Sequence, residues 1–125
     1  MERTRMTDVR TVGIPVGDQD RALEFYTGTL GFEKRMEAPL PGGGRWIEVA
    51  PPGATTTLAL VAARDGTTAG VETGIRLASP EAEADHSHLR AHGVEVSELL
   101  QWPGVPPMFT FRDPDGNGLT VVEQK

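Results

Sequence analysis

The two halves of this sequence carry the same pattern, and the repetition narrows the range of folds open to it. Gly13-Ile14 recurs as Gly74-Ile75, and Gly31-Phe32 recurs as Gly93-Val94, at an offset of 61 to 62 residues. A solenoid needs three or more repeats, so a pattern found twice favours duplication of one unit. In each half we expect a strand, a helix and three more strands. This order predicts an α+β fold in which two βαβββ modules form a curved mixed sheet around a cleft.

The first half shows strand and helix signals in turn. Apolar residues alternate with small or polar ones over residues 9–16, which is typical of a strand. Asp18 stands where a helix N-cap is expected, and Gly31 tolerates the positive φ that ends a helix. Glycine and proline then separate three more predicted strands. These strands are expected over residues 32–40, 45–50 and 55–62.

The second half repeats this order after a small, polar linker over residues 64–70. We interpret the chain as a single domain, with module one over about residues 9–63 and module two over about 71–125. Ser79, followed by Pro80, is predicted to cap a helix. The predicted elements are a strand over residues 71–78, a helix over 82–92, and strands over 94–99, 107–112 and 119–123.

Composition excludes several classes of protein and site. The chain has no cysteine, which rules out disulfides, thiolate metal sites and a cysteine nucleophile, and agrees with a cytoplasmic location. The formal net charge of −6 argues against a nucleic-acid partner, because that affinity comes largely from clustered Lys and Arg. No apolar run approaches the ~20 residues of a membrane span. We therefore expect neither nucleic acid nor a membrane as a partner.

Two motifs give the chain a resemblance to a known family. Residues 18–26 read DQDRALEFY and lead into Leu30-Gly31-Phe32, while residues 113–117 read DPDGN before the last predicted strand. On these motifs the chain resembles the vicinal oxygen chelate superfamily, which includes glyoxalase I, bleomycin-resistance proteins and extradiol dioxygenases. The resemblance covers nearly the whole chain and implies paired βαβββ modules and a homodimer. Both motifs shape the backbone, as the turn-forming Pro and Gly of DPDGN illustrate.

The same resemblance implies a metal held by four side chains, usually His, Glu or Gln, from the first and last strands of each module. The matching positions in this sequence are Thr11, Ala59, Gly74 and Thr120. These residues lack the imidazole and carboxylate groups that divalent ions require. We therefore expect neither the usual metal nor another cofactor.

All three histidines fall on the helix predicted over residues 82–92. His88 and His92 lie four residues apart, a spacing at which two side chains can share a ligand. The charged residues around them, with His86 close by, favour a solvent-facing surface instead. We therefore expect the histidines to face solvent, and the alternative is that they bind a metal ion.

Strand periodicity predicts which side chains face the cleft, because successive residues of a strand point to opposite faces. The residues expected to pack under the helices are Ile14, Ile47, Leu58, Leu60, Ile75, Phe109, Phe111, Leu119 and Val121. The residues expected to face the cleft are Thr11, Gly13, Trp46, Glu48, Thr57, Ala59, Val61, Gly74, Arg76, Met108, Thr110, Arg112, Thr120 and Val122. Trp102, in a loop, is expected to overhang the opening.

A cleft with aromatic side chains and a few hydrogen-bonding groups suits a planar or amphipathic organic ligand. The residues predicted to bind such a ligand are Trp46, Arg76, Trp102, Met108, Thr110 and Arg112. An arginine there can hold a carboxylate through paired hydrogen bonds. The alternative is an internal ion pair in which Glu48 contacts Arg76 or Arg112.

The lead functional prediction is a metal-free protein that binds a small hydrophobic or aromatic compound, in the manner of a bleomycin-resistance protein. The alternative is a glyoxalase-like lyase, isomerase or dioxygenase with a displaced active site. In that case Glu48 is the candidate catalytic residue, because desolvation beside Trp46 would raise its pKa toward that of a general base. No second acid, base or nucleophile is evident to complete such a site.

Overall fold

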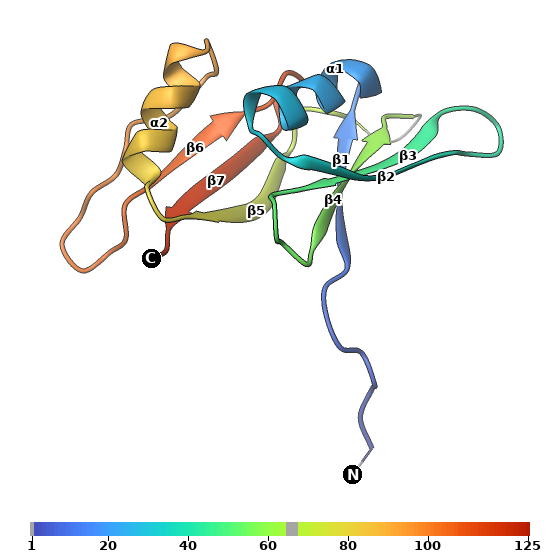
Figure 1. Cartoon of the computed structure of the whole chain (residues 1–125), viewed down its shortest axis with the longest axis horizontal. Coiled ribbons are helices and arrows are strands. Elements are labelled where there is room, and N and C mark those ends of the chain that lie inside the picture. The colour runs from blue at the N-terminus through green and yellow to red at the C-terminus, as the bar shows by residue number, and fades with distance from the viewer. Residues whose placement is uncertain (1, 65–67) are drawn as a thin grey trace.

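The computed structural model describes residues 2–64 and 68–125. In chain order the elements are β1 (Thr11–Val16), α1 (Gln19–Glu24), the π-helical turn η1 (Phe25–Thr29), β2 (Glu33–Pro39), β3 (Arg45–Ala50), β4 (Thr57–Ala62), β5 (Glu72–Ser79), α2 (Ala82–Ala91), β6 (Met108–Arg112) and β7 (Gly118–Glu123). The strands form two sheets that lie side by side, with both helices on the same side of them (Figure 1). The α+β prediction is confirmed.

The first sheet has the strand order β1-β4-β3-β2, and the second has the order β5-β7-β6. In each sheet the first strand pairs in parallel with the last strand of its own module. The other pairs are antiparallel. Each module therefore carries its helix on one face and leaves the opposite face, which we call the open face, uncovered by its own helix.

The helix of module one begins and ends as the sequence predicts. The Asp18 carboxylate accepts a hydrogen bond from the Arg21 amide at 3.1 Å, and Gly31 adopts a φ of +79° after the last turn. Between these points α1 widens into η1, where the Leu30 amide donates to the Phe25 carbonyl at 3.0 Å. This wider turn is absent from the sequence prediction, because hydrophobic spacing does not distinguish α from π hydrogen bonding.

The strand predicted over residues 94–99 is wrong. This segment forms one isolated bridge to β6, between Val96 and Phe111, and Leu100 just beyond it forms a second, with Met108. The Ser97 hydroxyl accepts the Thr110 amide at 2.9 Å, so a side chain replaces the carbonyl that a regular strand would offer. The next backbone contact comes three residues later, at Leu100, which breaks the two-residue repeat of a strand.

The helix α2 begins at Ala82 as predicted, but its capping differs from the prediction. The Ser79 hydroxyl accepts the amide of Glu81 at 3.1 Å rather than capping the helix itself. The Glu123 carboxylate, from β7, accepts the Ala82 amide at 3.1 Å. A side chain far away in sequence therefore satisfies the first turn, which local sequence signals cannot reveal.

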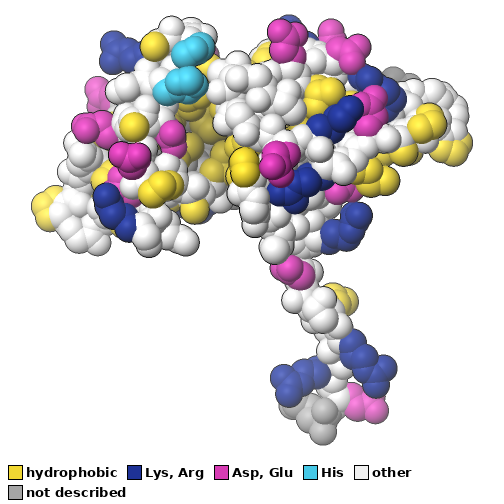
Figure 2. All heavy atoms as spheres, viewed as in Figure 1, with side chains coloured by type: hydrophobic (Ala, Val, Ile, Leu, Met, Phe, Trp, Pro, Cys, Tyr) yellow, Lys and Arg dark blue, Asp and Glu magenta, His cyan; other side chains and the backbone are white. Residues whose placement is uncertain are grey.

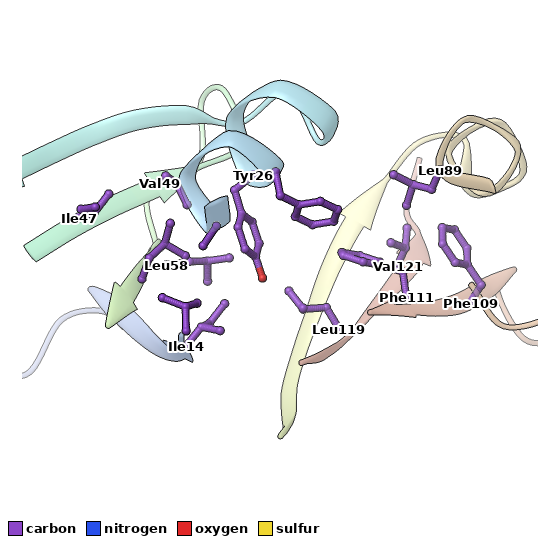
Figure 3. Packing of buried hydrophobic residues seen from close by; sticks show 14 of the residues in the cluster. Ile14, Tyr26, Ile47, Val49, Leu58, Leu89, Phe109, Phe111, Leu119 and Val121 are labelled. Carbon is purple, nitrogen blue, oxygen red and sulfur yellow. The ribbon is translucent and has the colours of Figure 1, made fainter. Parts of the chain in front are cut away.

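The residues predicted to pack under the helices form one core shared by both modules (Figure 3). All of them are buried except Ile75, which is partly buried against the same cluster. The ring centroids of Phe25 and Phe111 lie 6.3 Å apart and join η1 to β6. The two modules are thus held together by apolar packing on the helix side of the sheets.

Polar groups of the DPDGN turn also hold the two modules together through hydrogen bonds. The Tyr26 hydroxyl donates to the Asp113 carboxylate at 2.9 Å, and the Asn117 side chain donates to the Pro15 carbonyl at 2.8 Å. Burial, reinforced by Asp113, raises the pKa of Tyr26, so its hydroxyl keeps the proton that it donates. No helix within the described residues is long and apolar enough to cross a membrane.

Candidate functional site

A cluster of polar side chains lies on the open face of the first sheet. Thr11 of β1 is in register with Thr57 of β4, and Glu48 of β3 is in register with Ala59 of the same strand. Their neighbours in sequence point to the other face and form the core. Glu48 is only 3% exposed, so its charge needs partners within the protein.

Three donors surround the Glu48 carboxylate. Its Oε2 accepts from the Trp46 indole Nε1 at 2.7 Å and from the Arg10 guanidinium at 3.3 Å. Its Oε1 accepts from the Thr57 hydroxyl at 2.8 Å, and that hydroxyl also contacts the hydroxyl of Thr11. The carboxylate thereby fixes the orientation of the Trp46 ring on the sheet.

These donors reverse the predicted pKa shift of Glu48. The hydrogen bond from Trp46 is the largest cause that lowers the pKa below its ordinary value of 4.5, and burial opposes it without prevailing. Thr57 and Arg10 lower the pKa further. The raised pKa expected from desolvation is therefore wrong. Glu48 is ionised at neutral pH and is a weak base.

A cavity of about 350 Å³ adjoins the Trp46 ring, and we call it the Trp46 cavity. Its other lining residues are Leu40, Arg45, Val61, Ala62 and Arg64. Ligand pockets usually occupy ~300–1,000 Å³ and combine apolar walls with a few polar groups. The Trp46 cavity meets both conditions.

The two arginines of the Trp46 cavity differ in how they are held. Arg45 is tied to Asp20 at 2.5 Å and to Glu37 at 2.8 Å, two acidic residues outside the cavity lining. Arg64 contacts only the Gly43 carbonyl, at 3.5 Å, among the described residues. Arg64 is therefore the cation that is freer to meet an anionic group.

The predicted residues of module two lie on the open face of the second sheet. Arg76, Thr120 and Thr110 form one row across its three strands, and Val122 is in register with Met108 in the next row. Strand periodicity thus predicted correctly that these side chains share a face. The Trp46 cavity itself is lined by residues of module one and by Arg64, which directly follows it.

Arg112 is already engaged by another charged residue. Its guanidinium pairs with Glu72 of β5, the opposite edge strand of the sheet, and also donates to the Gly116 carbonyl at 3.1 Å. A Cβ at Gly118 would lie 2.6 Å from the Glu72 carboxylate, so the pair crosses β7 directly over this glycine. The ion pairs proposed between Glu48 and Arg76 or Arg112 are wrong, because Glu48 pairs with Arg10 instead.

Trp102 lies in the loop between the Leu100 bridge and β6, on module two. It is 63% exposed and is not part of the Trp46 cavity lining. Sequence reasoning also missed Arg10, which precedes β1, and Arg64, which follows β4. No local motif marks these two arginines, because only the packing of β3 and β4 brings them beside the site.

Comparison with known proteins decides the family. The profile of the Glyoxalase/Bleomycin resistance protein/Dioxygenase superfamily matches residues 9–121. The chain belongs to this superfamily. Among its relatives, YetH of Bacillus subtilis is 28% identical over 120 residues, which is 92% of this chain and 97% of YetH.

Solved structures of the superfamily share the whole fold. A member from Sphaerobacter thermophilus superposes with a TM-score of 0.90 and 35% identity, covering 97% of this chain and 100% of that one. TnmS3, described as an antibiotic binding protein from Streptomyces sp. CB03234, superposes with a TM-score of 0.87 and 32% identity. The match covers 98% of this chain and 100% of TnmS3.

The superfamily's metal positions do not fit a metal in this chain. The Thr11 hydroxyl is bonded to Thr57, and Ala59 and Gly74 offer no side-chain donor. Gly74 lies at a β-bulge with a φ of +74°. Across residues 2–64 and 68–125, no three His, Asp or Glu side chains are grouped to hold a metal ion. The donor set therefore lacks the ligands that a divalent ion requires.

The lowered pKa of Glu48 predicts an acid-dependent contribution to stability. A carboxyl whose pKa is lower in the folded state stabilises the fold above its unfolded pKa, and this stabilisation disappears as pH falls through the folded value. Glu48→Gln is expected to cost about 1–3 kcal/mol at pH 7. The difference in stability should begin to narrow below pH 4.5, the ordinary pKa that applies in the unfolded chain, and should close as pH falls through the lower pKa of folded Glu48.

Urea denaturation of the wild type and Glu48→Gln at pH 7, 5, 4 and 3 measures this deficit. Glu33→Gln, at an exposed position of β2, is the matched control and should change stability little at any pH. A deficit that stays constant down to pH 3 would show that ionised Glu48 does not provide the stabilisation.

Proposed function

We propose that the chain is a small-molecule-binding protein that holds a planar hydrophobic or aromatic compound against Trp46. The observation that carries this proposal is the Trp46 ring, fixed by Glu48 at the edge of a cavity of about 350 Å³. Because the hydrogen bond to Glu48 fixes the indole before any ligand binds, the ring loses little conformational freedom when a ligand stacks on it. Similarity to TnmS3, an antibiotic binding protein, supports the same class of function.

Arg64 suggests that the ligand carries an anionic group. It lines the cavity beside the apolar residues Leu40 and Val61, and a guanidinium can bind a carboxylate or phenolate. The ligand class is therefore a planar aromatic acid or phenol. Arg76, Met108, Thr110, Arg112 and Trp102 are proposed to contact the parts of a larger ligand that extend beyond the Trp46 cavity.

Equilibrium dialysis with 2-naphthoate tests the proposal, because this probe joins a planar apolar body to a carboxylate. The expected result is saturable binding at one site per chain, with the naphthoate recovered chemically unchanged. Naphthalene itself should bind more weakly, because it offers nothing to Arg64. Failure of 2-naphthoate to bind at millimolar concentration would contradict the proposal.

We also propose that the chain acts as a homodimer. Residues 2–8 run away from the domain as an extended arm (Figure 1), and Figure 2 shows the arm projecting beyond the rest of the surface. Met6 on this arm is 84% exposed, and Val9 at its base is 61% exposed. A second copy packed against the arm would cover such apolar side chains.

Light scattering during size-exclusion chromatography tests the dimer. The expected mass is about twice the 13.4 kDa of one chain. Removing residues 2–8, which leaves Arg10 in place for Glu48, should shift the equilibrium toward the monomer. A full-length chain that elutes as a monomer at 100 µM would contradict the proposal. The cytoplasmic location stays a prediction.

The alternative function, a lyase or isomerase with Glu48 as general base, receives less support from the geometry. Three donors keep Glu48 ionised and lower its pKa, whereas a general base works best with a pKa near the working pH. Chemical conversion of a bound probe during dialysis would favour that alternative. Recovery of the unchanged probe favours binding.

A further inference from the structure

A second pocket lies on the helix side of the sheets, where the two modules meet. We call it the inter-module pocket. Leu30 of module one faces Leu77, Leu89 and Phe111 of module two across it. In Figure 2 a hollow with hydrophobic side chains is visible between the two halves, beside the histidines. The pocket is separate from the Trp46 cavity, which lies beside the open face.

The size of the inter-module pocket suits one small ring. Its volume is about 130 Å³, close to the ~150 Å³ apolar cavity that accommodates benzene in a well-studied case. Its buried walls, Phe111 at 2% and Leu89 at 4% exposed, belong to the packed core. Burying an aromatic ring among such side chains is favourable by ~25 cal/mol per Å² of apolar surface.

The mouth of the pocket carries a negative charge. Asp85 and His88 are three residues apart on α2, and both line the pocket. Within the described part of the chain, no hydrogen bond or ion pair engages the Asp85 carboxylate. The His88 imidazole is already used, because its Nε2 lies 3.3 Å from the Thr29 carbonyl on η1. A cationic group on a ligand would therefore find Asp85 free.

The position of η1 strengthens this assignment. Thr29, the last residue of this π-helical turn, and Leu30, which follows it, both line the pocket, and such turns occur often at functional sites. The opposite wall comes from β5 and α2 of the other module. An occupant would contact both modules at once, and would raise the melting temperature of the folded state.

We propose that the inter-module pocket binds a small arylalkylamine, with its ring between Leu77 and Phe111 and its ammonium group at Asp85. An anionic ligand would be repelled by the Asp85 carboxylate, and a neutral ring would gain no attraction from it. The inference is independent of the proposed function, since it concerns another face of the molecule and a ligand of opposite charge.

Benzylamine, benzyl alcohol and benzoate are the probes that test the proposal at pH 7.5. Binding is followed by the NMR signals of the Leu77 and Val121 methyl groups, which lie at the pocket, and by thermal unfolding. Benzylamine should shift these signals and raise the melting temperature, while benzyl alcohol should bind at least about tenfold more weakly. Benzoate should leave the methyl signals unchanged.

Asp85→Asn removes the charge and keeps the size of the side chain. It should weaken benzylamine binding at least about tenfold and leave benzyl alcohol binding within about twofold. Glu83→Gln, at an exposed position of the same helix, is the matched control and should leave both affinities unchanged.

Two results would overturn the proposal. One is equal affinity of the wild type for benzylamine and benzyl alcohol, which needs no variant and so does not depend on how Asp85→Asn folds. The other is benzylamine binding that shifts the Trp46 indole signal and leaves the Leu77 and Val121 methyl signals unchanged. Binding of 2-naphthoate at Trp46 is a separate result that neither outcome affects.

Discussion

Replacing Asn117 by alanine is expected to lower the free energy of unfolding by about 3–5 kcal/mol. Asn117 is fully buried, and its side-chain amide donates to the Pro15 carbonyl at 2.8 Å and to the Asp113 carboxylate at 3.0 Å. Its side-chain carbonyl accepts the Gly70 and Val71 amides at 2.8 and 2.9 Å. Alanine would remove all four hydrogen bonds, including those that join the DPDGN turn to Pro15 of β1 and to the backbone before β5.

Urea denaturation measures this loss. Gln124→Ala removes an amide side chain from an exposed position and should change the free energy of unfolding by less than about 0.5 kcal/mol. A loss below about 1 kcal/mol for Asn117→Ala would mean that water replaces the four hydrogen bonds at little cost. The hydrogen bonds of the DPDGN turn would then contribute little to holding the two modules together.

Replacing Trp46 by alanine is expected to weaken 2-naphthoate binding at least about tenfold, or ~1.4 kcal/mol. The substitution removes the aromatic wall of the cavity and also the indole donor to Glu48. Trp46→Phe keeps a ring but loses the donor, so its affinity should fall between those of the wild type and Trp46→Ala. Isothermal titration measures all three.

Val105→Ala provides the control for this series. Val105 is 39% exposed in the loop before β6 and lies outside the Trp46 cavity lining. Its replacement should leave the affinity within about twofold, because it removes apolar surface elsewhere on the molecule. Equal affinities for Trp46→Ala and the wild type would place the ligand away from Trp46.

The strands whose residues alternate cleanly could be predicted from the sequence. In β1, β3 and β4 one face is apolar and packs under the helix, so a period of two assigns each side chain to its face. The segment over residues 94–99 shows the same alternation yet forms only bridges. Its pairing with β6 depends on the Ser97 hydroxyl and on Leu100, which forms the next bridge three residues after Ser97. The alternation of apolar and polar residues reveals neither feature.

The sequence predicts which face of the sheet carries the candidate site. It does not predict the direction in which the pKa of Glu48 shifts. Trp46 and Glu48 are two residues apart in a strand, so their shared face follows from the pleat. The hydrogen bond from Trp46 is the largest cause of the lowered pKa of Glu48, and donors from Thr57 and Arg10, which strand register brings close, lower it further. Sequence reasoning considered burial alone and therefore predicted the wrong direction.

The indole Nε1–H signal of Trp46 gives the most direct test of the binding proposal. In Trp102→Phe this is the single indole signal of the chain, and its hydrogen bond to Glu48 makes it sensitive to movement of the ring. Titration with 2-naphthoate is expected to shift the signal in a saturable way, while the naphthoate is recovered unchanged. A signal that stays in place while the probe binds, or a probe that is converted, would contradict the proposal that this chain binds a planar compound at Trp46.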